Sequence, residues 1–134
     1  MINHVEIYVS NLECSKKFYS FLLSELGYKL FQEWPDGFSY KMGGLYIVFV
    51  QAEKEFVKNG YHRKNIGLNH LAFSLASPQA VDELRQKLLL AGCNELYAEG
   101  YPFAGGKDYY AAFFEDPERL KIELVVNSDN QAET

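Results

Sequence analysis

The chain has 134 residues, 48% of them hydrophobic and 23% charged, which is typical of a folded domain with its own core. A net charge of −5 and the lack of a basic stripe argue against nucleic acid as the main partner. The longest apolar run, 45–50, is too short to cross a bilayer, no basic segment leads an apolar one, and two cysteines form no disulfide framework. We therefore expect a cytoplasmic protein without a membrane span.

The first half of the chain predicts one helix and four strands. Residues 2–9 alternate in polarity and read as a strand that carries His4 and Glu6 on one face. Asn11 is a helix cap, and Gly27 is a typical stop after the helical apolar pattern. The remaining strands are expected at 28–34, 38–42 and 45–51. The order of elements is β-α-β-β-β.

The second half repeats this order. The opening Ile2-Asn3-His4 returns as Leu68-Asn69-His70, with an offset of 66 residues between the two histidines. Ser77 is expected to cap a helix whose first position is Pro78 and which ends at Gly92. Strands are expected at 68–75, 94–100, 109–115 and 120–126, with a glycine-rich loop at 101–107. An internal repeat of this kind predicts two modules of the same topology.

The predicted fold class is α+β, with two tandem β-α-β-β-β modules whose curved sheets face each other and enclose a cavity. Neither module has a core large enough to stand alone easily, so we expect a single domain over 1–128. Module one is 1–51, the linker is 52–67, module two is 68–128, and 129–134 is a polar tail.

Three side chains form a candidate metal site. Glu123 lies between Ile122 and Leu124 in the last strand, where a carboxylate buried without a partner is costly. If its face points into the same cavity as His4 and His70, a bound cation supplies the partner. Two imidazoles and one carboxylate suit divalent Fe, Mn, Zn, Ni or Co and leave positions open for substrate. The alternative is that both histidines are polar strand residues bonded to the backbone.

Further side chains are candidates for proton transfer or substrate binding. Glu6 lies two residues beyond the first histidine and is a general base, a support for the metal ligands, or a solvated rim residue. Lys107 and Tyr109 follow the glycine-rich loop, which either covers the cavity or is an ordinary hairpin. Trp34 lines a pocket or fills the core. Tyr110 follows the same loop and shares its alternatives, and His62 in the linker is either a surface residue or one that reaches a substrate. The sequence assigns no further role to His62, Lys107 or Tyr110.

The span 1–126 resembles the vicinal oxygen chelate superfamily, which contains glyoxalase I, extradiol dioxygenases, and fosfomycin and bleomycin resistance proteins. The residues that carry the resemblance are His4, His70 in GLNHLAFSL, and Glu123 in FFEDPERLKIELV, where DP precedes the final strand. The resemblance implies that these three residues hold a metal between the paired modules and that the metal binds two vicinal oxygens of a substrate. It also implies a homodimer.

The sequence departs from this family at two positions. Glyoxalase I members usually add a fourth ligand, a Glu on the last strand of the first module, and aligning 45–50 with 120–125 puts Val48 there. This departure weakens a glyoxalase I assignment and leaves the three-ligand pattern of extradiol dioxygenases, although the chain is shorter than a typical four-module dioxygenase. Arg119 stands where many relatives have Gly in the turn.

Two functions follow from the resemblance. One is a metal-dependent enzyme, of lyase, isomerase or dioxygenase type, in which Glu123 and Glu6 are the candidate catalytic carboxylates. The other is a metal-free, bleomycin-resistance-like protein that binds a small molecule in an acidic, aromatic-lined groove. No sequence feature supports a third possibility, a module that only binds other proteins.

Overall fold

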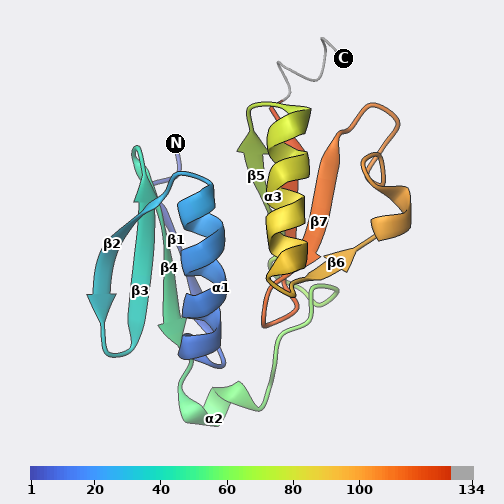
Figure 1. Cartoon of the computed structure of the whole chain (residues 1–134). Coiled ribbons are helices and arrows are strands. Elements are labelled where there is room, and N and C mark those ends of the chain that lie inside the picture. Colours follow the sequence, from blue (N-terminus) through green and yellow to red (C-terminus); the bar gives the residue numbers. More distant parts are fainter. Residues whose placement is uncertain (128–134) are drawn as a thin grey trace. The chain divides into compact units, whose positions relative to one another are not determined.

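The computed structural model describes residues 1–127, so the predicted tail at 129–134 and residue 128 lie outside the described residues. The chain divides into two compact units, Met1–Tyr61 and a second that begins at His62 (Figure 1). The division falls inside the predicted linker 52–67. Each unit is a four-stranded sheet with a helix against it, which confirms the two predicted modules.

The first unit follows the predicted order of elements. Its elements are β1 (His4–Val9), α1 (Leu12–Glu25), β2 (Lys29–Trp34), β3 (Gly37–Met42), β4 (Leu45–Gln51) and the short helix α2 (Lys54–Val57). The strand order is β1-β4-β3-β2, with β1 parallel to β4. Asn11 caps α1 by accepting a hydrogen bond from the amide of Cys14. Tyr19 of α1 stacks on Phe49 of β4 with ring centroids 4.1 Å apart, which fixes the helix to one face of the sheet.

The second unit repeats this architecture. Its elements are β5 (His70–Leu75), α3 (Pro78–Leu90), β6 (Asn94–Leu96), the 3₁₀ helix η1 (Ala98–Gly100), β7 (Ala111–Glu115) and β8 (Lys121–Val126). The strand order is β5-β8-β7-β6, with β5 parallel to β8. Ser77 caps α3, and the helix buries Val81, Leu84 and Leu88.

The two sheets share the same register. In the first unit Glu6 pairs with Val48, and in the second Ala72 pairs with Glu123. Because His4 and His70 both begin the first strand of their unit, Val48 occupies the position that corresponds to Glu123. The alignment made from the sequence is therefore confirmed, and the first unit offers no carboxylate at this position.

Two strands of the second unit, β6 and β7, are shorter than the sequence predicts. The strand expected over 94–100 ends at Leu96, because Tyr97 adopts a left-handed conformation with φ of 58° and η1 follows. The strand expected from 109 begins only at Ala111. The hydroxyls of Tyr101 and Tyr110 both donate to Asp82 of α3, so this segment is held against the helix and does not extend the sheet.

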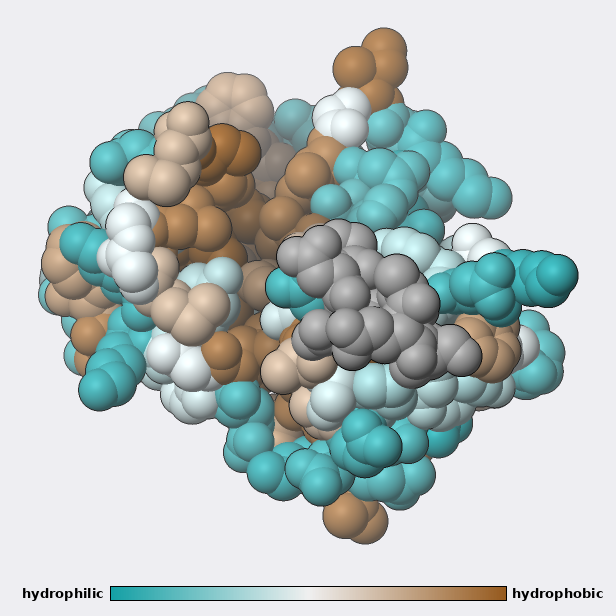
Figure 2. Space-filling view, turned by 90° about the horizontal axis from the view of Figure 1, so that it is seen from above, coloured by the Kyte–Doolittle hydropathy of each residue, from teal (hydrophilic) through white to brown (hydrophobic). Residues whose placement is uncertain are grey.

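The surface is mixed in character. The face seen in Figure 2 carries both hydrophobic and hydrophilic side chains, and the hydrophobic ones gather over part of it. Large apolar side chains are exposed in both units, among them Ile2, Phe31, Leu68 and Phe103. Within residues 1–127, none of the helices has the length and apolar character needed to span a bilayer.

Candidate metal and ligand site

The pairing of β5 with β8 brings two of the three predicted metal ligands together. His70 begins β5, and its Nε2 lies 3.9 Å from Oε1 of Glu123 in β8. The Glu123 side chain is only 7% exposed, so it does not face solvent as an ordinary surface carboxylate does. Since these residues come from the first and last strands of the unit, their proximity follows from the parallel pairing of those strands.

The asparagine before each histidine selects one tautomer of the neutral imidazole ring. Asn69 Oδ1 lies 2.6 Å from Nδ1 of His70, and Asn3 Oδ1 lies 2.7 Å from Nδ1 of His4. An amide oxygen can only accept, so Nδ1 carries the hydrogen and Nε2 of the neutral ring keeps its lone pair. This is the hydrogen-bonding pattern of a histidine that binds metal through Nε2. In His70, that lone pair lies toward the buried carboxylate of Glu123, and a cation suits the position between two acceptors.

Sequence reasoning assigned the asparagines no role. The signal was present, because Asn precedes His in both copies of the repeat. Because Asn and His recur together at equivalent positions of the repeat, the asparagine is expected to be part of the site along with the histidine.

Tyr109, a predicted substrate-binding residue, contacts the metal-ligand candidate directly. Its hydroxyl donates to Oε2 of Glu123 at 2.5 Å. Burial, this hydrogen bond and the charge of Glu123 raise the pKa of Tyr109 to about 12. The phenol therefore keeps its proton at neutral pH and acts as a donor that holds one carboxylate oxygen, while the other lies toward His70.

A pocket of about 380 Å³ opens beside this carboxylate, entirely within the second unit. The residues that line it are Tyr97, Ala104, Gly105, Tyr109, Phe113, Lys121 and Glu123. The ammonium of Lys121 lies 5.7 Å from the ring centre of Tyr97 and 5.9 Å from that of Phe113. Sequence reasoning missed Lys121, although it lies two residues before Glu123 and so shares its strand face.

The other predicted residues lie elsewhere. Lys107 is exposed in the loop before β7 and does not line the pocket. Glu6 is exposed on β1, and Trp34 ends β2, where a Cβ on Gly37 would come within 2.4 Å of the indole. His62 accepts a hydrogen bond at Nδ1 from the amide of Lys64. Both Glu6 and Trp34 belong to the first unit, and their roles stay predictions.

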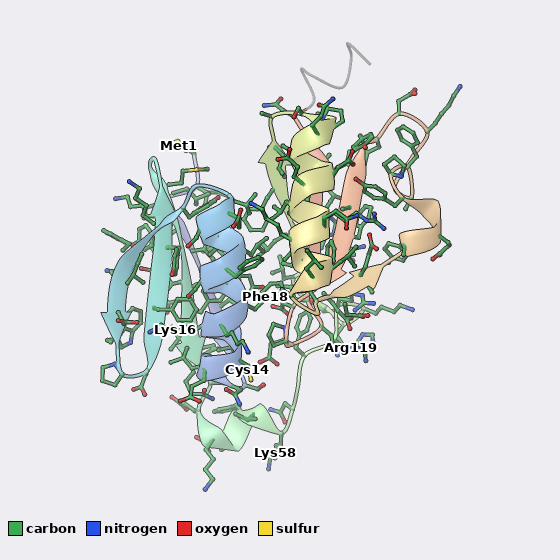
Figure 3. All side chains as sticks on the ribbon, in the orientation of Figure 1. Met1, Cys14, Lys16, Phe18, Lys58 and Arg119 are labelled. Atoms are coloured by element: carbon green, nitrogen blue, oxygen red, sulfur yellow. The ribbon has the colours of Figure 1, made fainter. Side chains whose placement is uncertain are left out.

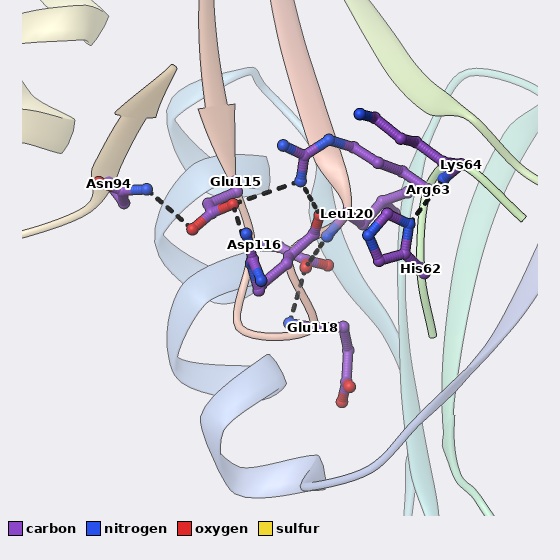
Figure 4. Close-up of polar contacts among 9 residues, drawn as sticks. His62, Arg63, Lys64, Asn94, Glu115, Asp116, Glu118 and Leu120 are labelled. Carbon is purple, nitrogen blue, oxygen red and sulfur yellow. Dashed lines mark hydrogen bonds and ion pairs between the residues drawn. The ribbon is translucent and has the colours of Figure 1, made fainter. Parts of the chain in front are cut away.

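The DP sequence before the last strand has a clear structural role. Asp116 is 6% exposed, and its Oδ1 accepts hydrogen bonds from the amides of Glu118 and Leu120, both at 2.8 Å (Figure 4). Arg119 lies in the turn that precedes β8 (Figure 3), and its carbonyl accepts from Arg63 at 2.9 Å. These bonds fix the turn from which β8 starts and thereby set the positions of the strand's side chains.

Two of the three predicted metal ligands, His70 and Glu123, lie together in the second unit and suit a metal. Among residues 1–127 there is no group of three or more His, Cys, Asp or Glu side chains that could hold a metal ion. His70 and Glu123 supply one nitrogen with a fixed lone pair and one buried carboxylate, both suited to a divalent transition metal. His4, the third predicted ligand, belongs to the first unit and has the same ring orientation toward its asparagine.

Comparison with known proteins agrees with the fold. The family model described as Glyoxalase/Bleomycin resistance protein/Dioxygenase superfamily matches residues 1–124. The uncharacterized protein YqjT of Bacillus subtilis (strain 168) is 48% identical over 127 residues, covering 95% of this chain and 99% of that protein. The crystal structure of a candidate glyoxalase from Bacillus halodurans is 53% identical with a TM-score of 0.93, covering 95% and 96% of the two chains. A glyoxalase/bleomycin resistance protein from Albidiferax ferrireducens T118 has a TM-score of 0.69 at 22% identity, covers 94% and 98%, and shows the shared fold.

Proposed function

Because the chain belongs to the glyoxalase/bleomycin resistance protein/dioxygenase superfamily, we propose that it is a divalent-metal-dependent enzyme acting on a small substrate with vicinal oxygens. His4, His70 and Glu123 hold the metal. The observation that carries the proposal is the lone-pair nitrogen of His70 opposite the buried carboxylate of Glu123, because two acceptors at 3.9 Å are stabilised by a cation between them. Fe, Mn, Zn, Ni and Co all suit this donor set.

The bound metal supplies Lewis-acid chemistry toward the oxygens of the substrate. The chain's own residues prepare that chemistry. Asn69 keeps the His70 ring in one tautomer, and Tyr109 holds one oxygen of Glu123 so that the other lies toward the histidine. Glu123 and Glu6 are the carboxylates available to move a proton, as a lyase, isomerase or dioxygenase requires.

A second function is favoured by the pocket. Three aromatic rings line a 380 Å³ space beside Lys121 and Glu123, and such a space binds a small molecule whether or not a metal is present. A metal-free binding protein of the bleomycin-resistance kind is therefore the alternative.

Elemental analysis of the purified protein separates the two functions. We expect about one divalent metal per chain in the wild type and in His62→Ala, because His62 is not a proposed ligand. His4→Ala, His70→Ala and Glu123→Gln should each lose the metal while retaining the circular dichroism spectrum of the wild type. A protein that takes up no metal even after reconstitution with each of the five candidate ions would support the binding function and contradict the enzyme.

We further propose that the protein is a cytoplasmic homodimer, as its resemblance to the superfamily implies. Light scattering at micromolar concentration tests the dimer, and a monomeric mass would contradict it.

A further inference from the structure

Lys121 is the positive charge of the pocket. It pairs with His70 across β5 and β8 and shares the pocket with Tyr97 and Phe113. Among the described residues, no carboxylate lies within ion-pair distance of its ammonium, which instead lies within 6 Å of two ring centres. The carboxylate that lines the same pocket, Glu123, is held by the hydroxyl of Tyr109 and forms no ion pair with Lys121, so the ammonium is available to a ligand.

The spacing along β8 separates this charge from the proposed metal. Lys121 and Glu123 are two residues apart on one face of a strand, about 6–7 Å along its axis. Tyr109 already donates to Glu123, which reduces the repulsion between that carboxylate and an anion at Lys121. A single ammonium also suits one carboxylate better than a phosphate dianion, which favours several converging donors.

We propose that the pocket of the second unit binds the carboxylate of a small aromatic acid, with Lys121 as its anion-binding residue and the rings of Tyr97 and Phe113 against the apolar body. The oxygens that reach the metal are then at the opposite end of the molecule from this carboxylate. The position of those oxygens at the metal rests on the proposed function, whereas the binding of the carboxylate at Lys121 does not.

Gly105 shapes the wall of this pocket. A Cβ at this position would lie 3.0 Å from Cδ1 of Tyr109 and 3.2 Å from Cζ of Phe113, so the loop can approach both rings only because it has no side chain there. The neighbouring Gly106 has more room, since its Cβ would lie 3.5 Å from Cβ of Tyr109. The two glycines therefore provide a matched pair of variants, because only the first should narrow the pocket.

The test is an NMR titration of the full chain with four probes. Benzoate and benzamide, which have the same shape but differ in charge, are titrated into the metal-free protein. We expect benzoate to bind at least about tenfold more tightly than benzamide, as a charged hydrogen bond implies. 4-Methylcatechol and 3,4-dihydroxybenzoate are titrated into the protein with and without Zn(II). 4-Methylcatechol should bind only the protein with Zn(II). 3,4-Dihydroxybenzoate should bind the protein with and without Zn(II), and more tightly with it.

Variants locate the effect. Lys121→Met should weaken benzoate binding roughly tenfold, while Lys107→Met, which changes an exposed lysine outside the pocket, should leave it unchanged. Gly105→Ala should weaken benzoate binding, and Gly106→Ala should not. Equal binding of benzoate to wild type and Lys121→Met, or of benzoate and benzamide to wild type, would overturn the inference. If Lys121→Met weakens benzoate binding but 4-methylcatechol binds no more tightly with Zn(II) than without it, the anion site is supported and the proposed metal function is contradicted.

Discussion

The hydroxyl of Tyr109 lies 2.5 Å from Oε2 of Glu123, and this bond joins the end of the glycine-rich loop to the central strand β8. It connects the wall of the pocket to the carboxylate that is the proposed metal ligand. Any change in the charge of Glu123 should therefore be detectable at the phenol.

The first prediction concerns the ionisation of Tyr109. With its pKa raised to about 12, this phenol should ionise above the ordinary tyrosine value of 10. Because the folded pKa lies above the unfolded one, burying the protonated phenol and its hydrogen bond to Glu123 contributes stability that is fully present below pH 10 and is lost as the pH rises through 12. An ultraviolet difference titration of wild type against Tyr109→Phe measures this pKa.

Glu123→Gln is the control for that titration. Removing the charge should lower the pKa of Tyr109 but leave it above 10, because burial is the largest cause of the shift. If Tyr109 ionises at the same pH in the variant and the wild type, the coupling between the two groups is absent.

The second prediction concerns Asn69. Asn69→Ala removes the acceptor at Nδ1 of His70, so the ring is free to present either tautomer, and we expect metal affinity to fall roughly tenfold or more. Asn69→Asp keeps an acceptor oxygen and should retain most of the affinity. Competition with a metal-binding dye measures both, and equal affinity in Asn69→Ala and wild type would show that the asparagine does not orient the ligand.

The third prediction concerns Val48. It occupies the position of Glu123 in the first unit and is only 3% exposed, so this unit lacks the carboxylate expected of a glyoxalase I. We expect little or no turnover of the glutathione hemithioacetal of methylglyoxal with added Ni(II), Co(II) or Zn(II). Val48→Glu should tighten metal binding, and Val48→Gln, of similar size without the charge, should do so much less. Robust turnover by the unmodified protein would contradict this.

The fourth prediction concerns the turn before β8. Arg119 has φ of 68°, a left-handed conformation that glycine adopts without strain. Arg119→Gly should raise the free energy of unfolding by about 0.5–1 kcal/mol. Its exposed ion pair with Glu115, at 3.6 Å, is worth little. Urea unfolding measures the change. Arg119→Ala, which loses the ion pair but keeps the strained backbone, should not be stabilised, and equal stabilisation of both variants would rule out backbone strain as the cause.

The fold was predictable because its signals are local and occur twice. The Asn-His repeat, the caps at Asn11 and Ser77, and the alternating strands all agree with one topology, and the match between Val48 and Glu123 follows from the register. The early end of β6 was not predictable from local pattern. The strand ends because Tyr97 adopts a left-handed conformation, and the segment after it is held by hydrogen bonds from Tyr101 and Tyr110 to Asp82, which lies 19 and 28 residues earlier in the chain.

The candidate site was predictable only in its most distinctive side chains. Histidine and buried glutamate are rare in apolar strands, so His70 and Glu123 could be found from the sequence, and their proximity agrees with that choice. Lys121 could not be found in this way, because a lysine in a strand is usually on a solvated face. What distinguishes it is a pocket built by Tyr97 and Phe113 from other segments.

The strand order has a consequence for synthesis of the chain. β8 is the last strand of its unit in sequence but lies between β5 and β7, so neither neighbour has its full set of pairing partners until residues 121–126 have left the ribosome. The first unit reaches the same point at Gln51 and can complete its sheet while the second is still being made. Nascent chains halted between the two points should therefore have every strand of the first sheet available for pairing, while the edges of β5 and β7 in the second unit stay exposed to other chains.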